Sequence, residues 1–133
     1  MISADPIKDM SRNLEKALDS RVEVIGNLYL VNKQRDLAIH SGDSSFSFKV
    51  GYEITFQDIH QQGMMLNKAE ILLLPEELPI FSSALISHGA SLPSNYSQHL
   101  IMEPNVYCLY MESCELPERF AERLAAALKA IDS

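Results

Sequence analysis

The segment from Phe46 to Phe56 constrains the fold of this chain more than any other. Six apolar residues at its even positions alternate with Ser, Lys, Gly, Glu and Thr at its odd positions. Because successive side chains of a β-strand point to opposite faces, this alternation predicts one long strand with a buried and a water-exposed face. The apolar face needs a covering layer, so we expect a sheet with helices gathered on one side.

Similar patterns predict the elements on either side of this strand. Helical spacing of apolar residues predicts helices over residues 6–19, 76–88 and 117–131, and shorter apolar runs predict strands at 21–31, 36–40, 64–74, 98–102 and 106–111. Gly26 and Asn27 are expected to bend or bulge the first strand, and Asn32 to Gln34 to form the turn after it. The prediction is a single α+β domain over residues 1–133, with a mainly antiparallel sheet of about six strands and three helices in the order αββββαββα.

Two predicted helices show which side should be buried. In the second helix the apolar stripe comprises Leu78, Phe81, Leu85 and Ile86. In the last helix we expect Phe120, Leu124, Leu128 and Ile131 to face the core, and Glu118, Arg119, Glu122, Arg123 and Lys129 to face water.

The strands at 64–74 and 106–111 differ from the long strand because they are apolar on both faces. If helices cover one face only, the other face keeps an apolar set. This set is either the residues of the opposite parity or the six residues Met65, Ile71, Leu73, Tyr107, Leu109 and Met111. An exposed apolar face of this kind is typical of a dimer interface or of the floor of a pocket. The pattern therefore predicts a homodimer that forms through this sheet face.

Charge and cysteine content exclude several classes of partner. Eleven Lys and Arg residues against 18 Asp and Glu give a formal charge of −7, and the basic residues are scattered. Such a surface repels phosphate backbones and anionic lipids, so we expect neither nucleic acid nor membrane as a partner. Residues 1–16 contain no signal-peptide core, and Cys108 and Cys114 lack the spacing of redox or zinc motifs. These features favour the cytoplasm.

Motifs of the familiar enzyme classes, such as GxSxG, HExxH and the glycine-rich phosphate loops, do not occur in the sequence. The segment around His99 is the one place where polar groups of chemical interest gather between apolar strands. We select five residues as ligand-binding candidates, namely Tyr96, Ser97, Gln98, His99 and Tyr110. His99 and Glu103 are the candidates for acid–base catalysis, and the same segment could instead be an ordinary polar loop. One His and one Glu are too few to hold zinc, so neither metal nor cofactor is expected.

The order of features from Gly51 to Ile131 resembles that of the LppY/LpqO-type bacterial family, which has no established activity. The resemblance rests on the segment from Tyr96 to Leu100, the Glu103–Pro104 turn and the strand from Val106 to Tyr110. It implies two histidines flanking an asparagine, and a further histidine on the next strand. This chain keeps the second histidine as His99 but has Ser97, Gln98 and Tyr110 at the other positions. The resemblance thus implies the fold and a site that has lost two of its three potential ligands.

These observations favour a cytosolic bacterial module that binds a small ligand or another protein without catalysis. The alternative is a hydrolase-like enzyme in which His99 acts as base or metal ligand beside Glu103. That alternative requires the two side chains to converge in one concave pocket.

Overall fold

The computed structural model describes residues 6–88, 92–103 and 106–132, apart from the side chains at positions 6–7, 37–41, 46, 48 and 61. The elements in chain order are α1 (Pro6–Leu18), β1 (Glu23–Ile25), β2 (Leu28–Ser41), β3 (Ser44–Gln61), β4 (Met64–Leu73), the 3-10 turn η1 (Pro75–Glu77), α2 (Leu78–Ser87), β5 (Ser97–Met102), β6 (Tyr107–Glu115) and α3 (Pro117–Ile131). The predicted α+β class and the order αββββαββα are confirmed. None of the helices in these ranges is long and apolar enough to cross a membrane.

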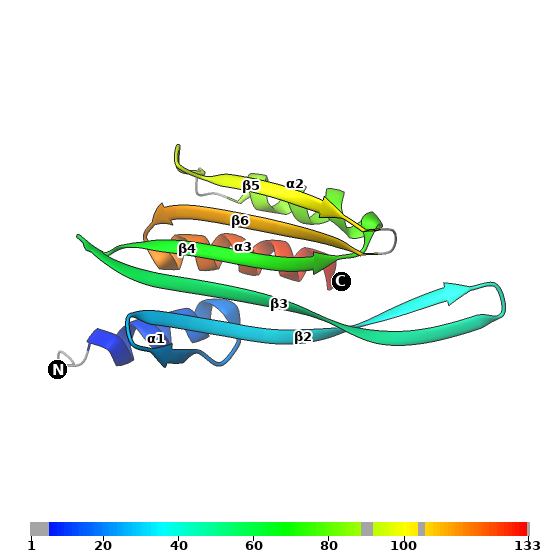
Figure 1. The fold of residues 1–133 in the computed structure, drawn as a ribbon, viewed down its shortest axis with the longest axis horizontal. Helices are drawn as coiled ribbons and strands as arrows, with labels where there is room; N and C mark the ends of the chain where they lie inside the picture. Colours follow the sequence, from blue (N-terminus) through cyan, green and yellow to red (C-terminus); the bar gives the residue numbers. More distant parts are fainter. Residues whose placement is uncertain (1–5, 89–91, 104–105, 133) are drawn as a thin grey trace.

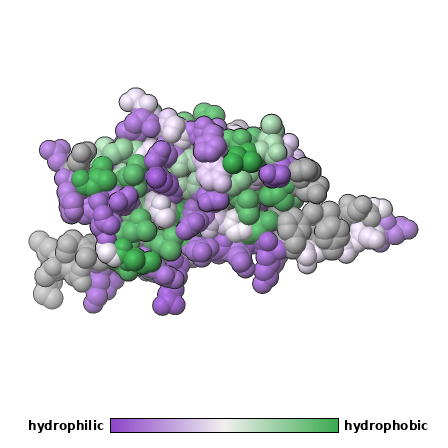
Figure 2. Space-filling view, viewed as in Figure 1, coloured by the Kyte–Doolittle hydropathy of each residue, from purple (hydrophilic) through white to green (hydrophobic). Residues whose placement is uncertain are grey.

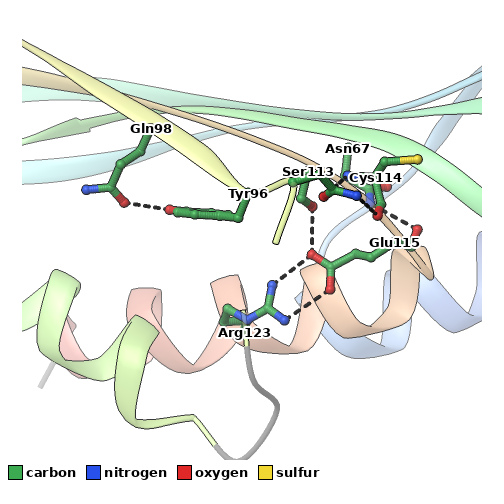
Figure 3. A network of polar contacts seen from close by, with 8 residues as sticks. Asn67, Tyr96, Gln98, Ser113, Cys114, Glu115 and Arg123 are labelled. Carbon is green, nitrogen blue, oxygen red and sulfur yellow. Dashed lines mark hydrogen bonds and ion pairs between the residues drawn. The ribbon is translucent and has the colours of Figure 1, made fainter. Parts of the chain in front are cut away.

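The six strands form one sheet in the order β1-β2-β3-β4-β6-β5, and each neighbouring pair is antiparallel. All three helices lie on the same side of this sheet, behind the strands in Figure 1 and below them in Figure 3. We call the uncovered side the open face. The core lies between the sheet and the helices, and Phe56 and Phe120 meet edge to face in it with ring centroids 6.1 Å apart.

The turn predicted at Asn32 to Gln34 is wrong. β2 continues through these residues, with Asn32 opposite Glu53 and Gln34 opposite Gly51 on β3. All three side chains are exposed, and polar residues do not interrupt a strand whose side chains reach water. The reversal occurs earlier, at the segment for which we expected a bend or bulge. Gly26 adopts a φ of 58° there and closes a two-residue turn between Ile25 and Leu28.

The long strand predicted at Phe46 to Phe56 is part of β3. Val50, Tyr52, Ile54 and Phe56 are buried, which confirms the alternation, whereas the side chains of Phe46 and Phe48 lie outside the described part of the chain. β3 pairs with β4 from Tyr52 onward, so residues 44–51 of β3 pair with β2 alone. This hairpin projects beyond the rest of the sheet (Figure 1).

In β4 and β6, alternate side chains point into the core and onto the open face. Five of the six residues named for the surplus apolar set are in the core, with exposed fractions of 5% or less: Met65, Ile71, Leu73, Leu109 and Met111. The opposite parity faces outward and includes Lys68, Glu70 and Glu112. The open face of these strands is therefore interrupted by charges at its centre.

Two further expectations for the helices are wrong. Arg123 is only 1% exposed, because it follows the buried Phe120 by three residues and so lies on the buried side of α3. Ile86 is 69% exposed and does not belong to the buried stripe of α2, which comprises Phe81 and Leu85.

A partly buried ion pair joins β2 to the turn before α2. Arg35 donates from Nη1 and Nη2 to the two carboxylate oxygens of Glu77, at 2.8 and 2.6 Å. The backbone N–H of Leu74 also donates to Glu77, at 2.8 Å. Burial acts to raise the pKa of Glu77, but these hydrogen bonds outweigh it and the pKa is lowered.

Candidate functional site

A hollow of about 360 Å³ lies on the open face, over β3, β4, β6 and β5. Its lining consists of Glu53, Thr55, Lys68, Ala69, Glu70, Ser97, Gln98, His99, Tyr110, Met111 and Glu112. Figure 2 views this face and shows hydrophilic and intermediate residues mingled over its middle, with hydrophobic groups toward the margins. The hollow has the volume of a small-molecule site, and most of its lining residues are polar in type.

Strand register gathers the polar side chains of the hollow into two rows. In the first row Glu53 on β3 lies opposite Glu70 on β4, Glu70 opposite Tyr110 on β6, and Tyr110 opposite His99 on β5. Directly opposed residues of antiparallel strands share a face with Cβ atoms about 4.5–5.5 Å apart. Four residues from four strands therefore lie side by side across the sheet, and we call them the Glu53–His99 row.

The second row is formed in the same way, two residues later on β3 and β6 and two residues earlier on β4 and β5. Thr55 lies opposite Lys68, Lys68 opposite Glu112, and Glu112 opposite Ser97. The Lys68 ammonium and the Glu112 carboxylate are 3.7 Å apart and remain substantially exposed. This row therefore presents hydroxyl groups at both ends and an exposed ion pair in the middle.

Tyr110 connects the members of the Glu53–His99 row. Its hydroxyl donates to Oε1 of Glu70 at 3.2 Å, and its ring stacks on the ring of His99 with centroids 4.6 Å apart and planes inclined by 8°. The thiol of Cys108, two residues earlier on β6, donates to the same Glu70 oxygen at 3.7 Å. Glu70 is thus held by two donors, and His99 is oriented by the tyrosine ring.

The protonation of these groups limits the chemistry of the hollow. The hydrogen bond with Cys108, together with the charges of Cys108 and Glu70, raises the pKa of Tyr110 to about 12. Burial raises the pKa of the Cys108 thiol. At neutral pH both groups keep their protons, so Tyr110 acts as a hydrogen-bond donor and Cys108 is a poor nucleophile.

The charge of the hollow is negative at neutral pH. Among the residues that the structure describes, the lining contains three carboxylates, those of Glu53, Glu70 and Glu112, against a single lysine, Lys68. Glu53 and Glu70 also face each other across two strands, an arrangement that is destabilising for like charges. A ligand that brought hydrogen-bond donors or a positive charge between them would relieve this repulsion.

The predicted site residues separate onto the two faces of the sheet. Ser97, His99 and Tyr110 lie on the open face and line the hollow. Gln98 also contributes to the lining, but its side chain accepts a 2.6 Å hydrogen bond from the Tyr96 hydroxyl on the side of the helices (Figure 3). Burial raises the pKa of Tyr96 to about 12. Glu103 follows the end of β5 and does not line the hollow.

Sequence reasoning missed the half of the hollow that comes from β3 and β4. Glu53 and Thr55 belong to the wet positions of the alternating strand, and Lys68 and Glu70 are polar interruptions of an apolar run. These interruptions were a usable signal, because charges inside a run that is otherwise apolar on both parities must find water or a partner. Their convergence with His99 depends on strand register, which the sequence did not reveal.

A buried polar network on the opposite side of the sheet fixes β6 over α3. Arg123 donates to both carboxylate oxygens of Glu115 at 2.9 and 3.0 Å, and the hydroxyl of Ser113 donates to one of them at 2.6 Å. Nδ2 of Asn67 donates to the backbone carbonyl of Glu115 at 3.2 Å, which ties β4 to the same point (Figure 3). These four residues are between 0 and 5% exposed.

The start of β5 is fixed to β6 by Asn95. Its side-chain amide donates to the carbonyl of Cys114 and accepts from the N–H of Cys114, both at 2.9 Å. This two-bond clamp sets the register that places Ser97 opposite Glu112 and His99 opposite Tyr110. The polar segment selected from the sequence thus has a structural component as well as residues that reach the hollow.

No cluster of three or more His, Cys, Asp or Glu side chains with the geometry of a metal site occurs within the described ranges. No curated protein and no solved structure matches the chain. The model of the DUF1529 family, described as a Domain of Unknown Function (DUF1259), matches residues 12–130. This match covers most of the 133 residues. The chain therefore belongs to this family of domains of unknown function.

Proposed function

We propose that this protein is a non-catalytic binding module that holds a small polar molecule in the hollow of the open face. The observation that carries the proposal is the Glu53–His99 row, in which carboxylates and a stacked ring pair from four strands line one concavity. A stacked aromatic pair offers a flat wall, and the carboxylates offer acceptors for hydroxyl or ammonium groups.

The chemistry of the lining indicates a ligand rich in hydrogen-bond donors. The carboxylates of Glu53 and Glu70 are acceptors, and the excess negative charge favours a ligand that carries an amine. Glu70 already receives two bonds from Tyr110 and Cys108, so its position is preorganised before any ligand arrives. Preorganisation lowers the entropy lost on binding.

The hydrolase-like alternative has less support. It needs His99 and Glu103 in one pocket, but only His99 of these two lines the hollow. Tyr110 and Cys108, the other reactive groups near His99, are both held protonated at neutral pH. The finer assignment to the LppY/LpqO-type family is also our proposal, and it gains from the placement of Ser97, His99 and Tyr110 on one face.

Binding can be tested with three matched sugars: glucosamine, N-acetylglucosamine and glucose. They share one ring, and only glucosamine carries a positive charge at neutral pH. We expect glucosamine to raise the thermal midpoint of the full chain more than the two neutral sugars do, because a ligand that binds only the folded state stabilises it. A chain whose midpoint none of the three sugars changes at millimolar concentration would contradict the proposed ligand class.

Variants locate the effect in the hollow. Glu70→Gln should abolish the preference for glucosamine, whereas Glu122→Gln, a matched change at an exposed position of α3, should retain it. Tyr110→Phe keeps the ring that stacks on His99, whereas Tyr110→Leu removes it, so sugar binding should be weaker in Tyr110→Leu than in Tyr110→Phe. Binding that is equal in Glu70→Gln and in the wild-type protein would show that the sugar binds elsewhere.

A further inference from the structure

Within its six residues, β5 carries neither the charges nor the prolines that commonly protect an edge strand. β5 is the last strand of the sheet, and its six residues, SQHLIM, include no charged residue and no proline. Edge strands in monomeric proteins usually carry charges, prolines or bulges that prevent pairing with another chain. The opposite edge of the sheet carries such charges. β1 has only three residues and includes Glu23, and the part of β2 that extends beyond β1 carries Lys33, Arg35 and Asp36.

The helix below this strand has the same character. α2 lies beneath β5 at the same margin of the molecule (Figures 1 and 3), and none of its ten residues is charged. In this chain 22% of residues are charged, so two adjacent uncharged elements at one edge are unusual. Depletion of charge is the compositional mark of the centre of a protein interface.

Four exposed hydrophobic residues belong to these two elements. Ile80 and Ile86 on α2 are 50 and 69% exposed, and Ile101 and Met102 on β5 are 44 and 68% exposed. They are four of the seven large hydrophobic residues that are exposed in the described part of the chain. Figure 2 shows several hydrophobic groups among hydrophilic ones along the upper margin of the molecule, where Figure 1 places β5 and α2.

We infer that a second copy of this chain binds this edge, with β5 pairing antiparallel to its partner's β5 and α2 packing against α2. The edge has two layers, the last strand of the sheet, to which a further strand can pair, and a helix with exposed isoleucines. An extended peptide would satisfy the strand and leave Ile80 and Ile86 in water. An identical copy presents the same two layers, as an isologous interface requires.

Geometry restricts the register of this pairing. The two helices can meet only if both copies keep their open faces on the same side. Opposed residues must then share a face, so one residue of β5 lies opposite its own copy at the twofold axis. An axis at His99 or Leu100 pairs the most residues of the six-residue strand. With the axis at His99, Ser97 of each copy lies opposite Ile101 of the other. Either register brings the two hollows to the seam, although the dimer does not depend on ligand binding.

The size of the edge sets the expected strength of association. Six strand residues span about 20 Å, and a sheet with one helical layer is about 20 Å deep. An interface of this footprint falls at or below the lower end of about 1,200–2,000 Å² that specific complexes bury. We therefore expect a dimer that dissociates on dilution. The homodimer predicted from the sequence would thus form through the edge of the sheet rather than through its face.

Sedimentation velocity of the full chain between about 1 µM and about 1 mM tests the proposal, since interfaces of this size dissociate in that range. We expect the mass to rise from 14.9 kDa to twice that value as the concentration increases. Ile101→Lys and Ile86→Lys should each keep the chain monomeric. Ile25→Lys, the same change at the opposite edge where Ile25 is 56% exposed, should dimerise as the wild type does.

All four chains should have the same circular dichroism spectrum, because each substitution is at an exposed position. A wild-type chain that stays monomeric over the whole range would show that a second copy does not bind this edge, and it would overturn the proposal. A dimer that survives Ile101→Lys would place the interface elsewhere, with the same consequence. Loss of the dimer in Ile101→Lys but not in Ile86→Lys would refute the packing of α2 against α2.

Discussion

Removal of Arg123 is the perturbation whose effect on stability follows most directly from the structure. The Arg123 and Glu115 side chains are 1 and 7% exposed and share two hydrogen bonds of 2.9 and 3.0 Å. In Arg123→Met the Glu115 carboxylate would stay buried with the hydroxyl of Ser113 as its remaining side-chain partner. Breaking a buried ion pair in this way costs about 3–5 kcal/mol. For 133 residues this corresponds to a fall in Tm of about 10–18 °C.

Urea denaturation followed by circular dichroism measures this loss, with two variants for comparison. Arg123→Met/Glu115→Met leaves no buried charge, so it should cost less than Arg123→Met alone. Lys68→Met breaks an exposed pair, 57 and 47% accessible, and should cost about 1 kcal/mol or less. A loss below about 1 kcal/mol in Arg123→Met would refute the reasoning, as would a double variant that costs as much as Arg123→Met and Glu115→Met added together.

Two further predictions concern titration. Burial acts to raise the pKa of Glu77, but the hydrogen bonds from Arg35 and Leu74 lower it below its usual 4.5. The stability gained from Glu77 is therefore complete above pH 4.5. It is lost as the pH falls through the lower pKa of the folded state. The stability difference between the wild-type protein and Glu77→Gln, measured in urea, should therefore shrink between about pH 6 and about pH 3. Because Cys108 is the main cause of the raised pKa of Tyr110, Cys108→Ala should move that pKa from about 12 toward 10.0 in an ultraviolet titration, and an unchanged curve would contradict the assignment.

The sequence predicts elements well where the apolar period is unambiguous. The alternation ending at Phe56 and the spacing of Phe120 and Leu124 both correspond to buried faces of the elements expected. The error at Asn32 to Gln34 has a physical origin, because a strand open to water tolerates a polar triplet that resembles a turn. The error at Arg123 has another origin. A guanidinium on the buried side of a helix is stable only beside a buried acid, and Glu115 gives no sequence signal of that role.

The site was less predictable than the fold because it depends on pairing between distant segments. His99 and Tyr110 are separated by one hairpin, and both were selected from the sequence. Glu53 and Glu70 come from a different hairpin, and no local pattern relates them to His99. Only the pairing of β4 with β6 brings Glu53 and Glu70 beside His99 and Tyr110. In the sequence, α2 and β5 lie between these two strands.

The strand order also has a consequence for the order of folding. The β3–β4 and β5–β6 hairpins join segments that are close in the sequence, so their pairing closes short loops and can form early. The β4–β6 ladder joins residues about 40 positions apart and must wait for a larger loss of chain entropy. Glu70 and Tyr110, at a separation of 40 residues, form their hydrogen bond across this ladder. We therefore expect the two halves of the hollow to form independently and to meet in a late step, which the environment of Tyr110 would report in refolding experiments.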